Sequence, residues 1–231
     1  MTSLLTRLAA HSAALALFAG CGHSAGTPAP ASTAAAPSTQ SVAAKQSVSR
    51  GSLAPLASDA LIVLPVQTLR TSVPEWTDKV GEQRAYLSTV DDEIAFAVRD
   101  RGLRGQWAFP ADLARSAKRN PGYTADPYAI ALSPLVAVER DADKIIAEPL
   151  AGQLRAFAGL FNARYALIPT ELRFVPDPSG GRATVHLVVV DARAARLIWK
   201  GDVSGDGMKN FTPAVAAGLA GRIADLFTPA R

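Results

Sequence analysis

Cysteine and histidine are nearly absent from this chain. Its 231 residues include one cysteine, Cys21, and three histidines, of which only His186 lies beyond residue 58. Residues 59–231 therefore hold no cysteine and one histidine, which excludes cysteine–histidine zinc sites, Cys–His nucleophile pairs and multi-histidine metal centres within them. A single cysteine forms no disulfide within the chain, so the fold depends on its hydrophobic core.

Phosphate-binding and nucleophile motifs are also missing. Residues 59–231 contain no G-x-x-x-x-G-K, no G-x-G-x-x-G and no G-x-S-x-G pattern. Three of the 24 basic residues precede residue 59, whereas all 20 acidic residues lie in 59–231, which leaves 21 basic against 20 acidic residues in that range. A nucleic-acid-binding domain would carry a basic stripe, so no nucleic-acid partner is predicted.

The first 20 residues have the three parts of a secretory signal. Arg7 lies in a short leading segment, an apolar run of 11 residues follows over 8–18, and Ala19 and Gly20 precede Cys21. A membrane-spanning helix needs about 20 apolar residues, which is more than this run supplies. We therefore predict a signal peptide over 1–20.

Residues 17–21, L-F-A-G-C, resemble the lipobox of bacterial lipoproteins, with Phe18 where Leu, Val or Ile is usual. The resemblance implies cleavage before Cys21, which then carries a covalent diacylglycerol and an N-acyl group; no other cofactor is expected. Several acyl chains together give stable membrane anchoring. Gly22, in place of Asp, implies the outer membrane, with the folded domain facing the periplasm.

An alternative for this segment is an ordinary signal peptide, cut near Ala19 or Ala25, that leaves a free Cys21. After the cysteine, residues 22–58 consist mainly of Ala, Ser, Thr, Pro, Gln and Gly and contain no aromatic residue. Such a composition buries too little apolar surface to offset the entropy of ordering. We predict a disordered tether over 21–58; a sugar-bearing Ser/Thr/Pro stalk is the alternative.

Hydrophobic periodicity predicts one α/β (α+β) domain over 59–231, a mixed sheet packed by helices. The expected strands are 60–66, 106–109, 164–174, 182–191 and 196–203, and the first of them is expected to end or bulge at Pro65. The expected helices are 82–101, 110–119, 149–161 and a last one with Thr212 as cap and Pro213 in its first turn. A loop is expected over 67–76, short helices and loops over 123–148, and turns over 176–181 and 192–195.

Three segments resemble the envelope-domain family that includes the TolB amino-terminal domain, LpoB and CsgG. They are 61–66 (L-I-V-L-P-V), 161–168 (F-N-A-R-Y-A-L-I) and 188–199 (V-V-V-D-A-R-A-A-R-L-I-W). The resemblance implies the same fold. Ala194 and Ala195 stand where the family hairpin V-D-x-x-T-G has Thr-Gly, and a left-handed residue 195 would cost about 1 kcal/mol relative to glycine.

Three features are candidate sites for chemistry. His186 lies on a predicted strand, where a lone histidine is expected to be structural or exposed. Residues 202–207, D-V-S-G-D-G, resemble the first half of a calcium loop, but position twelve is Pro213 instead of the required Glu, so a polar loop is expected. Asp91 and Glu93 could serve a carboxylate-dependent hydrolase, although their positions fit the early part of a helix better.

A basic segment over 99–119 would suit an anionic partner such as peptidoglycan carboxylates or lipid head groups. The alternative is that these side chains cover the solvated faces of two short helices. The candidate interaction patch consists of Arg99, Arg101, Arg104, Arg115, Lys118 and Arg119.

The anchor, the tether and the missing catalytic motifs predict a lipoprotein that is not an enzyme. Its domain is expected to bind another envelope protein, as an accessory or regulator of cell-wall synthesis, with the membrane as second partner and no small-molecule substrate identified. Two alternatives remain open. One is a subunit of an oligomeric secretion channel of the curli-export type, which would need membrane-spanning hairpins with strands of about 9–11 residues. The other is the hydrolase that uses Asp91 and Glu93.

Overall fold

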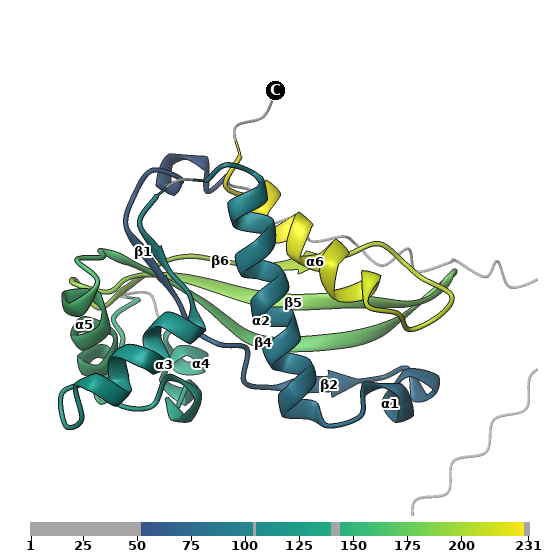
Figure 1. Ribbon diagram of the computed structural model, residues 1–231, viewed down its shortest axis with the longest axis horizontal. Helices are drawn as coiled ribbons and strands as arrows, with labels where there is room; N and C mark the ends of the chain where they lie inside the picture. The colour runs from purple at the N-terminus through teal and green to yellow at the C-terminus, as the bar shows by residue number, and fades with distance from the viewer. Residues whose placement is uncertain (1–51, 104, 140–143, 229–231) are drawn as a thin grey trace, which may run out of the picture. The chain divides into compact units, whose positions relative to one another are not determined.

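The computed structural model describes residues 52–103, 105–139 and 144–228. The predicted signal peptide, Cys21, most of the predicted tether and Arg104 lie outside these ranges. The described residues form an α+β fold, as predicted, in which helices pack on a six-stranded mixed sheet with the order β3-β1-β4-β5-β6, and β2 pairs with β4 (Figure 1).

The elements follow the predicted order with two additions. The strands are β1 Leu61–Val63, β2 Leu69–Thr71, β3 Trp107–Ala108, β4 Tyr165–Asp177, β5 Gly180–Asp191 and β6 Arg196–Ser204. The α-helices are α1 Pro74–Val80, α2 Gln83–Asp100, α3 Pro110–Arg119, α4 Ser133–Val138, α5 Leu150–Leu160 and α6 Ala214–Asp225, with 3-10 turns at Ala54–Leu56 and Pro127–Ala129.

The central strand β4 is long enough to pair with two short strands in succession. Its first half runs parallel to β1, with Leu61 opposite Tyr165, and its second half runs parallel to β2, with Leu69 opposite Leu172. A bulge between Pro169 and Glu171 separates the halves. Proline has no N–H to donate to the ladder, which explains the irregularity at this point.

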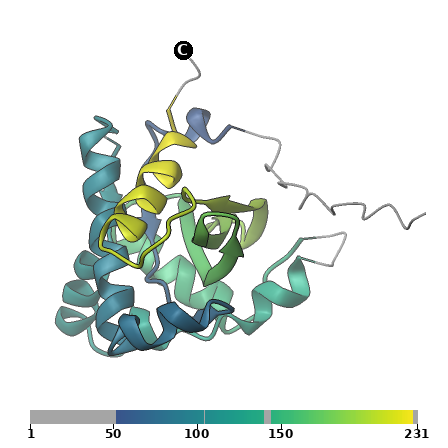
Figure 2. The same ribbon diagram turned by 90° about the vertical axis from the view of Figure 1, so that its right-hand side faces the viewer.

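A separate hydrophobic core lies on each face of the sheet. Helices α2 and α6 lie side by side on one face, where Leu167, Val189 and Ile223 are buried (Figure 1). Helices α3, α4 and α5 cover the other face only near β1, over Ile168 and Val190. Figure 2 looks along the long strands, with α6 in yellow beside them. One end of the second face therefore lacks a covering helix layer.

Helix α2 begins and ends where its sequence predicts. The Glu82 carboxylate accepts hydrogen bonds from the main-chain N–H groups of Arg84 and Ala85, at 3.0 and 2.5 Å. At the other end Gly102 has a φ of 67°, a conformation that glycine adopts without the clash of a side chain. Between these ends the predicted apolar stripe, which includes Val90 and Ile94, is buried.

Two sequence expectations about this fold are wrong. Residues 67–76 are not a loop, because they hold β2 and the start of α1; β2 is stabilised by pairing with the distant second half of β4, which local periodicity does not reveal. Thr212 does not cap α6 with its side chain; Pro213 precedes the first helical residue, and no side-chain hydrogen bond caps this end.

The segment before β1 packs against the end of the last helix. Leu53, assigned to the tether by composition, is buried, and its N–H donates to the carbonyl oxygen of Leu226 at 2.9 Å. Within the described ranges, no helix combines the length and apolar character needed to cross a bilayer.

The β5–β6 turn has the left-handed residue that the family pattern implies. Ala195 has a φ of 50° and is buried. The Asp191 carboxylate organises this turn: Oδ1 accepts from the N–H groups of Arg193 and Ala194, at 3.1 and 2.9 Å, and Oδ2 accepts from Arg164 Nε at 2.8 Å. Burial raises the pKa of Asp191, but these N–H bonds outweigh it and leave the pKa below its usual value.

Candidate functional site

The uncovered end of the sheet carries polar side chains on one face and apolar side chains on the other. Past the β4 bulge, Glu171 and Arg173 alternate with the buried Leu172 and Phe174. On β5 and β6 the same face continues through residues 184, 186, 202 and 204, each one step from a buried valine or leucine or a glycine. Period-two alternation of this kind is typical of a strand with one face in the core.

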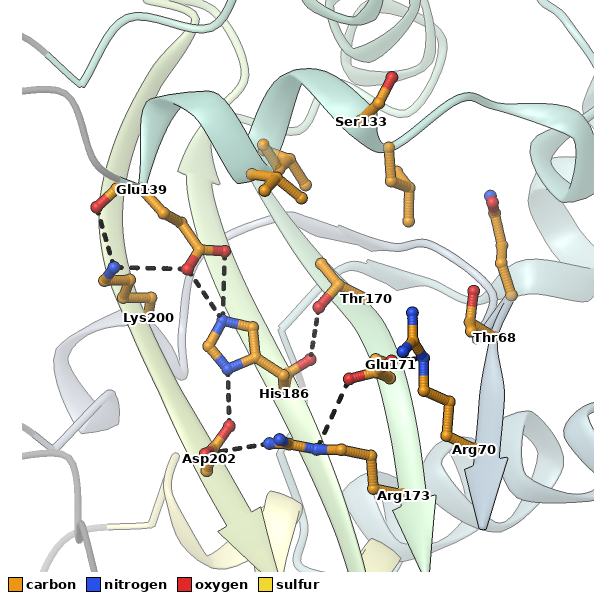
Figure 3. Close-up of a pocket in the computed structure, with 14 residues that line it drawn as sticks. Thr68, Arg70, Ser133, Glu139, Thr170, Glu171, Arg173, His186, Lys200 and Asp202 are labelled. Carbon is orange, nitrogen blue, oxygen red and sulfur yellow. Dashed lines mark hydrogen bonds and ion pairs between the residues drawn. The ribbon is translucent and has the colours of Figure 1, made fainter. Parts of the chain in front are cut away.

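His186 lies at the centre of this polar face, between two carboxylates (Figure 3). The β5–β6 register puts it directly opposite Asp202, and its Nδ1 lies 2.6 Å from Asp202 Oδ1. Its Nε2 lies 3.2 and 3.3 Å from the two carboxylate oxygens of Glu139, the residue that follows α4. An ionised carboxylate accepts but does not donate, so both contacts are hydrogen bonds when the ring carries a proton on each nitrogen.

Basic side chains extend the same network in both directions. Arg173 Nη2 lies 3.1 Å from Asp202 Oδ2, and Arg173 Nε lies 3.6 Å from Glu171 Oε2. Lys200 Nζ donates to the Glu139 main-chain oxygen at 3.0 Å and lies 3.3 Å from its Oε2. The result is a row in which basic and acidic side chains alternate; we call it the charged row: Arg70, Glu171, Arg173, Asp202, His186, Glu139 and Lys200.

A pocket of about 740 Å³ lies between the charged row and α4. Its polar floor comes from β4, β5 and β6, and α4 lies opposite this floor (Figure 3). Ser133 and Val136 are among the α4 residues that line the pocket. Val136 is 55 % exposed, so the rim presents an apolar side chain to solvent. A ligand in this pocket would meet both signs of charge and an apolar edge.

The geometry favours recognition over acid–base chemistry at His186. Both ring nitrogens already contact carboxylate oxygens, so no lone pair on the ring points toward a reactant. The only hydroxyl bonded to this residue within the described ranges is that of Thr170, which donates to the His186 main-chain oxygen at 3.3 Å. His186 links β5 to β6 and to the end of α4.

The residues proposed for a hydrolase do not form a pair. Asp91 is 5 % exposed and accepts a hydrogen bond from the Val66 N–H at 3.0 Å, inside the core between α2 and β1. Glu93 lies on the groove between α2 and α6. Burial raises the pKa of Asp91 from 3.8 to about 7; the Val66 N–H lowers it, and the charge of Asp92 raises it further.

The two aspartates of the segment that resembles a calcium loop contact different partners. Asp202 belongs to β6 and faces His186 and Arg173, whereas Asp206 lies 2.8 Å from Arg222 Nη2 of α6. Across the described ranges, no group of three or more histidine, cysteine or acidic side chains is placed to bind a metal ion.

The basic patch is spread over two helices and partly neutralised. The Arg99 guanidinium lies 4.8 Å from the centre of the Phe109 ring, and Arg101 lies 2.9 Å from Asp225. Arg115 pairs with Asp112, one turn earlier in α3. Lys118 and Arg119 lie in the last turn of α3, where positive charge is favourable. Arg104 and the predicted lipidation site Cys21 lie outside the described ranges, and use of the patch stays a prediction.

The sequence matches no known family model and no curated protein. Structures similar to this fold include the LpoB C-terminal domain from Escherichia coli, which is 11 % identical over 68 % of this chain and 96 % of that chain, with a TM-score of 0.35. A PelC dodecamer from Paraburkholderia phytofirmans is 13 % identical over 78 % and 95 %, with a TM-score of 0.39. Lipoprotein GNA1162 from Neisseria meningitidis is 13 % identical over 67 % and 84 %, with a TM-score of 0.32. Likeness at this level assigns neither a family nor a function.

Proposed function

We propose that this chain is an outer-membrane lipoprotein whose periplasmic domain binds another envelope protein without catalysing a reaction. The anchoring part of the proposal is supported by the L-F-A-G-C sequence ending at Cys21 and by the polar composition of 22–58. A domain on such a tether samples a layer of periplasm next to the membrane, with a mean reach of roughly 35 Å for a flexible chain of this length. It therefore meets partners without leaving its anchor.

The observation that carries the binding role is the charged row. Its members pair with one another, so the pocket offers no isolated charge to a simple ion. The main cost of binding at a polar surface is a charge that is left without a partner. A polypeptide segment with both acidic and basic side chains avoids this cost, because it can form new ion pairs with the residues of the charged row in place of the existing ones. The exposed Val136 on the rim adds apolar area for such a segment.

Photo-crosslinking in cells tests the binding role. A photoreactive amino acid is placed in the full chain at Val136, on the pocket rim, at Arg115, in the basic patch, or at Glu75, on the exposed side of α1. We expect a discrete crosslinked protein from Val136 and none from Glu75. A product from Arg115 alone would instead support the basic patch. If no position yields a protein product while the variants fold and reach the membrane, the binding role is wrong.

A charge reversal connects the crosslink to the charged row. Arg70 Nε lies 2.5 Å from Glu171 Oε1, and the Arg70 side chain is 75 % exposed, so Arg70→Glu alters one end of the row without burying a charge. We expect this change to remove the Val136 crosslink. Lys79→Glu, on the exposed side of α1, is the matched control and should leave it in place.

The anchor is tested separately. Cys21→Ser should abolish incorporation of labelled palmitate and move the chain from the membrane fraction to the soluble periplasmic fraction. A wild-type chain that takes up no label and lies in the soluble fraction would instead support an ordinary signal peptide, cut near Ala19 or Ala25. The identity of the crosslinked protein then shows whether the partner belongs to cell-wall synthesis, which is the accessory or regulatory role that we propose.

A further inference from the structure

The strand β6 lies at one edge of the sheet and is only partly covered. Residues 144–146 run beside its start, where Leu197 N–H donates to the Lys144 oxygen and Ile146 N–H donates to the Ala195 oxygen, at 2.9 and 2.8 Å. Beyond Leu197, no main-chain group in the described ranges is hydrogen-bonded to the outer side of this strand. An uncovered edge is a template for pairing with another strand.

The pairing with β5 determines which main-chain groups face outward. Gly205 N–H donates to the Ala183 oxygen at 2.9 Å, and hydrogen-bonded positions alternate along an antiparallel pair. Gly201 and Val203 therefore bond to β5. The N–H and C=O groups of Lys200, Asp202 and Ser204 point away from the sheet.

A second copy of the same strand can pair with this edge in a register that matches opposite charges. Antiparallel pairing across a two-fold axis requires outward-facing residues to lie opposite each other. An axis at Gly201 meets this requirement and places Lys200 opposite Asp202 of the second copy, twice. An axis at Lys200 would oppose two ammonium groups, and an axis at Asp202 would oppose two carboxylates, both of which are unfavourable.

We propose that two copies of this chain associate through antiparallel pairing of β6, with the two-fold axis at Gly201. Lysine on an edge strand normally opposes such pairing, but here the aspartate two residues later compensates it in the symmetric register. The Lys200 side chain is 44 % exposed, and its ammonium has three donors, of which two contact Glu139. One donor remains for the carboxylate of the second copy.

Side chains around the edge favour the same occupant. Ile198 on β6 and Ile145 beside its start are 43 % and 60 % exposed, so each copy contributes apolar area to the junction. Lys200 and Asp202 line the pocket, and pairing would bring the pockets of the two copies next to each other across the axis. The charge order Lys-Gly-Asp is complementary to itself in an antiparallel pair. Pairing with a second copy requires this property, whereas pairing with a strand from an unrelated partner does not.

Disulfide trapping in cells tests the register. Two differently tagged full chains are co-expressed, one with Lys200→Cys and the other with Asp202→Cys. Hydrogen-bonded residue pairs have Cα atoms about 5.5 Å apart, within the range that a disulfide spans. We expect a crosslink between the two tags well above the background of chains with only Cys21. Lys200→Cys expressed alone should crosslink much less, because that pair is out of register.

A proline substitution tests the role of the main chain. Because the Lys200 N–H points outward, Lys200→Pro removes a donor to a second copy but none to β5, whereas Lys200→Ala keeps it. The full chains are compared by sedimentation equilibrium in density-matched detergent. We expect the wild-type mass to rise toward a dimer with concentration, the alanine variant to associate more weakly, and the proline variant to stay monomeric.

Two outcomes would overturn the proposal. One is a wild-type chain that stays monomeric at all concentrations and gives no mixed disulfide. The other is a proline variant with an unchanged melting temperature that associates as the wild type does. If the proline variant unfolds, the disulfide experiment alone decides. The Val136 crosslink to a different protein is read separately, so the proposed envelope partner and the self-pairing succeed or fail independently.

Discussion

Replacement of Asp91 by asparagine should stabilise the protein at neutral and alkaline pH but not in acid. Asp91 Oδ1 accepts the Val66 N–H, while Oδ2 is buried with no hydrogen-bond partner in the described ranges. Burial is the largest influence on this carboxyl and raises its pKa from 3.8 to about 7. The folded protein therefore keeps a proton that the unfolded chain releases above pH 4.

The sign of the effect follows from proton linkage. Between pH 4 and pH 7 the folded state binds more protons at Asp91 than the unfolded state does, so the free energy of unfolding falls as the pH rises. One pKa unit is equivalent to about 1.36 kcal/mol, so the change from 3.8 to about 7 is equivalent to on the order of 4 kcal/mol. Asparagine cannot ionise and still offers an oxygen to the Val66 N–H, so Asp91→Asn avoids this loss.

Urea denaturation at intervals from pH 4 to pH 8 measures the effect. We expect the free energies of unfolding of wild type and Asp91→Asn to be similar at pH 4 and to diverge above it, with the variant more stable by a few kcal/mol at pH 8. Asp78→Asn, at an exposed position of α1, should show no such divergence. A difference that is constant with pH, or a variant that is less stable at pH 8, would refute the reasoning.

Three further predictions are checked by the same denaturation assay. Tyr86→Phe should raise the free energy of unfolding by about 1 kcal/mol, because the buried hydroxyl has no partner in the described ranges and burial raises its pKa to about 12; a loss of stability would reveal an unrecognised hydrogen bond. Gly181→Ala should lower the free energy of unfolding by about 1–3 kcal/mol, because the new Cβ would lie 2.6 Å from the buried Trp76 ring. Gly218→Ala, on α6 with no atom within 4 Å of the new Cβ, should raise the free energy of unfolding by about 0.5–1 kcal/mol. Equal effects of the two changes would contradict the packing argument. Asp191→Ala should cost about 2–3 kcal/mol through lost N–H acceptors in the β5–β6 turn, and a neutral result would show that the turn does not depend on the carboxylate.

Local sequence signals predicted the elements that are stabilised by their own residues. The apolar stripe of α2, its end at Gly102, and the long strands β4 and β5 are all as expected within a few residues. The strand β2 was missed because its three residues carry no periodic pattern and are stable only against β4. The turn between β4 and β5 is shorter than its Pro-, Ser- and Gly-rich sequence suggests, since both strands continue to Asp177 and Gly180.

The charged row was hidden from the sequence for a different reason. The sequence predicts a structural or exposed role for His186, and its immediate neighbours on β5 give no indication of a partner. The contact between His186 and Asp202 could be predicted in part, because a short turn over 192–195 makes β5 and β6 a hairpin. This hairpin places Asp202 opposite His186 only when the bulge at Val189–Val190 is taken into account. Bulges shift the register by one residue, and a shift of one residue would move Asp202 to the opposite face.

The second partner of His186 could not be obtained from the hairpin at all. Glu139 is 47 residues earlier in the chain, after a short helix whose position depends on core packing over β1 and β4. The useful sequence signal is instead the absence of apolar side chains on one face of three strands. Every second residue there is polar, while the other face of these strands is apolar; the polar positions are 171, 173, 184, 186, 202 and 204. A sheet face that is polar over three neighbouring strands has no core to cover it. Such a face indicates where the proposed binding surface lies, even when the individual ion pairs are unknown.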